Sequence, residues 1–183
     1  MRNLRIILFI VVMTVYRPVF SQAYDGAYDH KLGLGMLGSG KGAGFFIYTD
    51  SGLSNLFSLG MSIYSANLWV DKQYVTHNSS LLDKFFKYVT IFADIKTHFN
   101  SILNMNEHTD LYLAPSYAFL GGNFHLKAGF RYMFTDRFGM NLEVAYPVFL
   151  LRQKSLSREG DFFNRPYLSL SFFITRHYII RYW

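Results

Sequence analysis

The chain has 183 residues, of which 51% are apolar, 19% aromatic and only 16% charged. Roughly 25% charged residues is ordinary for a soluble domain, so this composition is unusual for a soluble protein. The sequence contains no cysteine, which excludes disulfides, thiolate metal sites, cysteine nucleophiles and a lipid-modified cysteine. We expect no metal ion and no other cofactor.

The N-terminus has the plan of a secretory signal peptide. Two arginines precede an apolar run over residues 6–15, and Pro18 follows that run. The run is well short of the ~20 residues that a spanning helix needs. We therefore predict a cleaved signal peptide over residues 1–21 and one mature domain over residues 22–183. The alternative is a retained N-terminal anchor helix.

The formal net charge of +6 overstates the basicity of the mature chain. The predicted signal peptide contains three arginines and no acid, so 15 basic and 12 acidic residues remain, a net charge of +3. No basic stripe accompanies a known nucleic-acid docking motif. We expect an exported protein that does not bind nucleic acid.

Alternation of apolar and polar residues recurs along the mature chain, whereas no segment has a convincing helical period. This pattern is typical of β-strands joined by turns. We expect strands at residues 32–36, 42–49, 57–65, 88–98, 111–119, 124–134, 140–148 and 166–175. The connections include a tight turn at residues 136–139 and long polar segments at residues 70–84 and 151–165.

Charge placement indicates which solvent the apolar face meets. A soluble exported barrel points apolar residues inward, whereas a transmembrane barrel points them outward to lipid. Lys127 and Arg131 share one face, and each would cost about 2–4 kcal/mol if it faced lipid near the midplane. Small residues on the polar face, aromatic residues toward strand ends and the strand lengths favour the membrane barrel. We predict an all-β, antiparallel, up-and-down, eight-stranded transmembrane barrel that is monomeric.

The tract GFRYMFTDRFGMNLEVAYP resembles the penultimate hairpin of small outer-membrane barrels. The mature start AYDGAYDHKLGLG and the final alternating strand are similar to an uncharacterised family of small barrels from Bacteroidetes-type Gram-negative bacteria, in the outer-membrane protein A/X-like group. The resemblance covers most of residues 23–175. It implies an outer-membrane location, periplasmic termini and assembly by the outer-membrane machinery. That machinery usually reads an outward aromatic residue at the end of the last strand, where Tyr178 is in phase and Trp183 is not.

The candidate functional residues are charged and polar side chains on the predicted inner face. Within a narrow barrel such charges pair across the interior, because unpaired ones are costly away from bulk water. A set of salt bridges holding the barrel shut is the structural interpretation, and a selectivity ring in a narrow pore is the functional alternative. The set comprises Lys127, Arg131, Glu143, Asp94, Lys96 and His125.

An enzyme is a third alternative. Some small barrels resemble lipid hydrolases or acyltransferases, which need a hydroxyl nucleophile with a neighbouring histidine and an acid. His98, His125 and His177 are present, but none lies in a recognisable catalytic motif. We therefore expect no enzymatic activity. Gly33 and Gly35 do not fit a phosphate loop and are expected to serve strand packing.

The long loops carry basic residues that would face outward if the termini are periplasmic. Ordinary solvated loop charge explains them, and contact with lipopolysaccharide phosphates is the alternative, through Arg152, Lys154 and Arg158. The expected partners are outer-membrane lipid and lipopolysaccharide. The sequence indicates a structural or surface-interaction role, with a narrow pore for small solutes as the runner-up.

Overall fold

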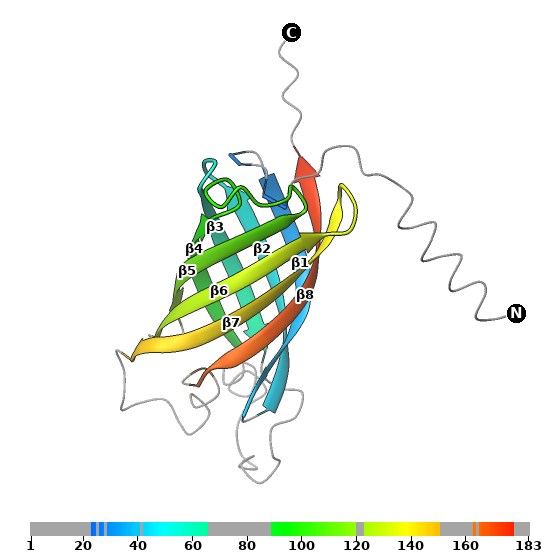
Figure 1. Cartoon of the computed structure of the whole chain (residues 1–183). Helices are drawn as coiled ribbons and strands as arrows, with labels where there is room; N and C mark the ends of the chain where they lie inside the picture. The colour runs from blue at the N-terminus through cyan, green and yellow to red at the C-terminus, as the bar shows by residue number, and fades with distance from the viewer. Residues whose placement is uncertain are drawn as a thin grey trace, which may run out of the picture.

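The structure, a computed structural model, describes residues 23–24, 26–27, 29–40, 42–65, 89–119, 123–150, 163 and 165–177. Within them, every strand pairs antiparallel with the next and the last strand pairs with the first, which closes a barrel (Figure 1). This arrangement confirms the predicted eight-stranded up-and-down barrel. The strands are β1 (Asp29–Ser39), β2 (Gly42–Gly52), β3 (Phe57–Ser65), β4 (Val89–His98), β5 (Thr109–Ala118), β6 (Asn123–Met133), β7 (Phe138–Leu150) and β8 (Tyr167–His177).

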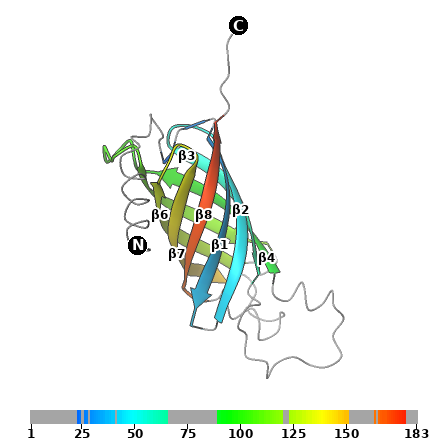
Figure 2. The same cartoon turned by 90° about the vertical axis from the view of Figure 1, so that its right-hand side faces the viewer.

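Different strand ends and connections lie at the two ends of the barrel. β1 begins where β8 ends, since Asp29 pairs with His177, and we call this end of the barrel the terminal end (Figure 2). The connections at residues 53–56, 99–108 and 134–137 also lie there. β3 and β7 end at the opposite end, which we call the loop end. No helix in the described part of the chain is long and apolar enough to cross a membrane.

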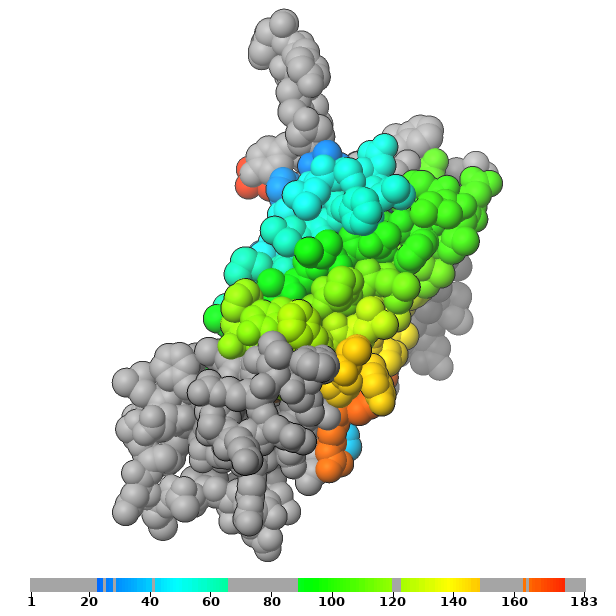
Figure 3. Space-filling view, turned by 90° about the vertical axis from the view of Figure 1, so that its left-hand side faces the viewer, coloured from blue at the N-terminus to red at the C-terminus, as the bar shows by residue number. Residues whose placement is uncertain are grey.

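The strands alternate strictly between the lumen and the outer surface. On β1, Lys31 and Leu37 are buried inside the barrel, whereas Leu34 is 60% exposed on the outer wall. The same alternation holds on the other strands, because successive side chains of a strand point to opposite faces. In the space-filling view the outer side chains of the middle strands pack into a continuous wall (Figure 3).

Two inward glycines make room for large rings inside the barrel. A Cβ atom added at Gly33 would lie 2.1 Å from the ring of Tyr48, and one added at Gly129 would lie 2.1 Å from the ring of Tyr112. Each ring therefore occupies the space that a side chain on the neighbouring strand would need. Strand packing accounts for Gly33, as the sequence indicated.

Several strands extend beyond their predicted ends. β1 begins at Asp29 and β2 continues to Gly52, in each case three residues past the predicted end, and β5 begins two residues early at Thr109. The tight turn after β6 occupies residues 134–137, two residues before the predicted position. The strands are longer than predicted because backbone pairing continues through charged residues when these point into a polar lumen. The predicted signal peptide and the candidate terminal residues Tyr178 and Trp183 lie outside the described residues.

Candidate functional site: the charged lumen

The lumen holds most of the charge that the strands carry. All six residues predicted for the inner face are buried there: Lys127, Arg131, Glu143, Asp94, Lys96 and His125. The structure adds Asp29, Lys31, Asp50 and Asp110, so the described lumen contains four Lys or Arg side chains and five Asp or Glu side chains. Near balance of the two signs is what a low-dielectric interior requires, because an unpaired buried charge is costly.

Lys127 organises the charge cluster nearest the loop end. Its ammonium lies 2.9 Å from a carboxylate oxygen of Asp94 and 3.8 Å from one of Glu143. The hydroxyl of Ser116 donates to Asp94 at 2.5 Å, and that of Tyr112 lies 2.8 Å from Glu143. These contacts join β4, β5, β6 and β7 across the interior.

Asp50 organises the central cluster. Its carboxylate forms an ion pair with Arg131 and lies 3.1 Å from the ammonium of Lys96. Arg131 also lies 3.9 Å from Asp110, and its guanidinium stacks over the ring of Tyr112 at 4.7 Å. The pairing partner of Arg131 is therefore Asp50 on β2, and Glu143 belongs to the cluster around Lys127.

A hydrogen-bonded chain of three side chains lies at the terminal end. Ser58 Oγ is 2.8 Å from His98 Nε2, and His98 Nδ1 is 2.7 Å from Asp110 Oδ2. The three residues come from the neighbouring strands β3, β4 and β5, and all are completely buried. We call them the Ser58–His98–Asp110 chain.

Tyr24, which precedes β1, covers this chain. Its ring stacks on the imidazole of His98 with centroids 3.5 Å apart and planes 6° apart. Its hydroxyl lies 2.6 Å from the carbonyl of Ser54 and 2.5 Å from that of Phe57. Burial, together with the charge of Asp50, raises the pKa of the Tyr24 phenol above its ordinary value, so the hydroxyl stays protonated and donates.

Aromatic rings fill the lumen at the loop end. Tyr64 lies at the centre of this aromatic layer, with Phe46 stacked at 4.8 Å and Phe92 edge-on at 4.9 Å. Phe163 and Tyr167 complete the layer. His125 packs edge-on against Phe92 at 5.1 Å, and neither of its ring nitrogens has a hydrogen-bond partner among the described residues.

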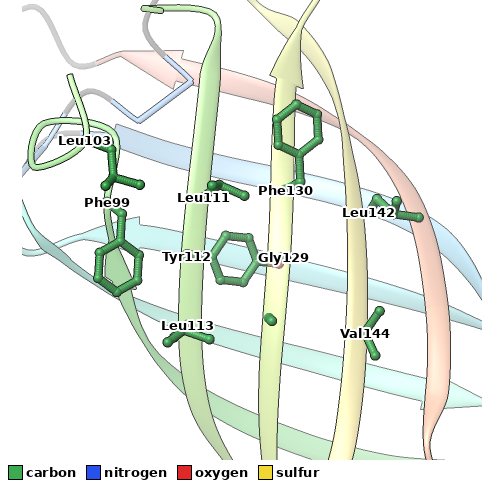
Figure 4. A pocket seen from close by; sticks show the side chains of 10 residues that line it. Phe99, Leu103, Leu111, Tyr112, Leu113, Gly129, Phe130, Leu142 and Val144 are labelled. Atoms are coloured by element: carbon green, nitrogen blue, oxygen red, sulfur yellow. The ribbon is translucent and has the colours of Figure 1, made fainter. Parts of the chain in front are cut away.

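An apolar depression of about 390 Å³ lies on the outer wall over β5, β6 and β7, near the terminal end (Figure 4). Leu111, Leu113 and Phe130 line it, and Phe99 and Leu103 of the β4–β5 connection border it. Its lining offers hydrocarbon and almost no polar atoms, so it is suited to contact with apolar chains and not to chemistry.

A protein-family model matches residues 14–165, which is most of the chain. The chain belongs to the DUF6646 family. DUF6646 is a family of unknown function, so membership assigns no activity. A search of curated proteins finds no match to this DUF6646 chain.

Among solved structures, this DUF6646 chain is similar to the N-terminal β-barrel domain of OprF from Pseudomonas aeruginosa. The TM-score is 0.52 and the sequence identity is 9%, and the similarity covers 83% of this chain and 100% of the OprF domain. At this identity the likeness supports the barrel fold alone. The expected origin in Bacteroidetes-type bacteria and the A/X-like grouping stay predictions.

Sequence reasoning missed Asp29, Lys31, Asp50 and Asp110 because they lie just outside the predicted strand ends. The alternation of the strands could have placed these four residues, since each is an even number of positions from inward residues of its strand. Asp50, for example, is two residues from the inward Tyr48. The contact between Ser58 and His98 was not predicted either. The side chain of His177 and the three basic loop residues Arg152, Lys154 and Arg158 lie outside the described part.

Proposed function

We propose that this chain is a small integral outer-membrane barrel with a structural or surface-interaction role. The outer wall carries the proposal, because each of the eight strands exposes large apolar side chains. Leu34, Ile63, Leu113 and Leu170 are between 43% and 60% exposed. An apolar surface that encircles the whole barrel would drive association in water, whereas a bilayer solvates it.

Aromatic residues near both ends of the outer wall support the same proposal. Phe138 stacks on both Phe134 and Phe172, and Phe134 lies in the β6–β7 connection at the terminal end. Tyr117 contacts Phe119 and Phe124 at the loop end. Two such groups, one at each end of an apolar wall, correspond to the aromatic belts that lie at membrane interfaces.

The filled lumen favours a closed barrel over the narrow pore for small solutes. Ion pairs occupy its middle, the aromatic layer occupies the loop end, and Tyr24 occupies the terminal end. Eight strands enclose an interior that side chains just fill. The proposed partners are outer-membrane lipid and lipopolysaccharide, and the proposed state is a monomer.

The test is fractionation of expressing cells, combined with gel electrophoresis of unheated and heated samples refolded in detergent. We expect the protein in the outer-membrane fraction and a shift in mobility on heating, because a closed barrel resists detergent until it is heated. Recovery of a soluble monomer from the periplasm without detergent would contradict the proposal.

A further inference from the structure

The Ser58–His98–Asp110 chain has the connectivity of a nucleophile, a general base and an orienting acid. An ionised carboxylate can only accept hydrogen bonds, so Asp110 takes the hydrogen on Nδ1 of His98. The Nε2 atom of the neutral imidazole then carries the lone pair and can accept the hydroxyl hydrogen of Ser58, for which the carboxylate of Asp50 competes. This is the protonation state in which a histidine can remove the proton of a serine nucleophile.

The strand paired with β3 carries a cation opposite the serine. Lys96 is the cross-strand partner of Ser58, and a Cβ atom added at Gly60, two residues along β3, would come within 3.1 Å of its ammonium. Acyl transfer develops negative charge on the carbonyl oxygen of the substrate, and a preorganised cation stabilises that charge in a water-poor site. The ammonium of Lys96 is paired with Asp50 at 3.1 Å, so it would have to turn toward Ser58 to take this role.

Access to Ser58 depends on Tyr24. The described residues before the first strand, which include Tyr24, take part in no strand pairing. Two further hydrogen bonds hold this segment. The side-chain amide of Asn100 donates to the backbone carbonyl of Tyr24 at 3.2 Å, and the backbone N–H of Ala23 donates to the carbonyl of Glu107 at 2.6 Å. These contacts can break without opening the barrel ladder, so Tyr24 can leave while the strands stay in place.

We propose that Ser58, His98 and Asp110 form an esterase site at the terminal mouth of the barrel, and that Tyr24 is its removable cover. Departure of Tyr24 leaves a flat slot parallel to the imidazole of His98, bordered by the carbonyl oxygens of Ser54 and Phe57. A slot shaped by a phenol ring accepts another flat ring. The substrate class is an aryl ester of a short carboxylic acid.

The reaction balances without a cofactor. Ser58 Oγ attacks the ester carbonyl and its proton passes to His98 Nε2. The carbon–oxygen bond to the aryl group breaks, and the departing phenolate takes that proton, which leaves an acyl-Ser58 ester. Water, deprotonated by His98, then releases the acid and restores the serine hydroxyl.

The experiment uses the full chain refolded in detergent and a fluorophosphonate probe, which bonds to an activated serine oxygen with loss of fluoride. The variants are Tyr24→Ala, which removes the cover, and Asn100→Ala, which removes one anchor of the cover and leaves the lumen intact. The matched control is Ser58→Ala in each background. Heat-modifiable mobility checks that each variant has closed its barrel, and mass spectrometry locates the modified residue.

We expect the probe on Ser58 in the uncovered variants, at a rate about tenfold or more above that of the unsubstituted chain, because covering reduces the competent fraction. Hydrolysis of p-nitrophenyl acetate should rise in parallel and fall by about 10³-fold or more in the Ser58→Ala controls. The inference would be overturned if either uncovered variant forms a closed barrel and the probe does not label Ser58. So would ester hydrolysis that persists after Ser58→Ala.

Discussion

Arg131 on β6 forms a buried ion pair with Asp50 on β2, a strand on the opposite side of the ring of eight. The pair therefore spans the interior, in contrast to the ladder hydrogen bonds, which join neighbours only. Because Arg131 also lies 3.9 Å from Asp110, its loss would leave two buried carboxylates with fewer compensating charges.

We expect Arg131→Met to lower the free energy of unfolding by about 3–5 kcal/mol, since removal of one partner leaves a buried charge uncompensated. Urea unfolding in lipid vesicles, followed by the gel shift, measures this loss. The double variant Arg131→Met/Asp50→Asn should recover part of it. Arg137→Met, in the exposed turn after β6, is the control and should change little. Equal effects at the two arginines would contradict the internal role of Arg131.

Leu34 lies midway along β1 on the outer wall. We expect Leu34→Arg to destabilise the barrel in vesicles by about 2–4 kcal/mol, because a cation near the midplane meets hydrocarbon. Leu53→Arg, in the exposed β2–β3 connection, should cost about 0–1 kcal/mol. The measurement is the unfolding free energy of each variant in the same vesicles. A similar small cost at both positions would place Leu34 in water.

Gly33→Ala brings a methyl group to within 2.1 Å of the Tyr48 ring, so the ring must move in a filled lumen. Overpacking of this kind costs about 1–3 kcal/mol. The control is Gly38→Ala on the same strand, where an added Cβ meets no atom within 4 Å. The measurement is the temperature at which the gel mobility of each variant shifts. Equal temperatures for both variants would show that the Tyr48 ring does not fill this space.

The filled lumen predicts no steady single-channel current from the unsubstituted protein in planar bilayers. Ion pairs and the aromatic layer cross the lumen, and Tyr64 contacts rings on three other strands. Recordings at several voltages on protein whose band is heat-modifiable provide the measurement. Steady conductance of uniform size would contradict the closed lumen and favour the narrow pore.

Parity was enough to predict which residues enter the lumen. Lys127 and Arg131 are two and six residues from His125, and all three point inward as the alternation indicated. Parity could not predict the partners, because the pairing of Arg131 with Asp50 depends on barrel closure and strand stagger, which a single sequence does not display. The position of Tyr24 could not be predicted for another reason, since Tyr24 lies in a segment whose sequence has no alternating pattern.

The pairing of β1 with β8 along Asp29–Ser39 has a consequence for how the protein is made. The residues of β1 find these partners only after β8, the last of the eight strands, has been synthesised. Until then both outermost strands present open edges, which readily pair with other chains. The seam also joins residues far apart in sequence, a topology associated with slow folding. The cell must therefore keep this apolar polypeptide from pairing with its own copies until β1 and β8 have joined.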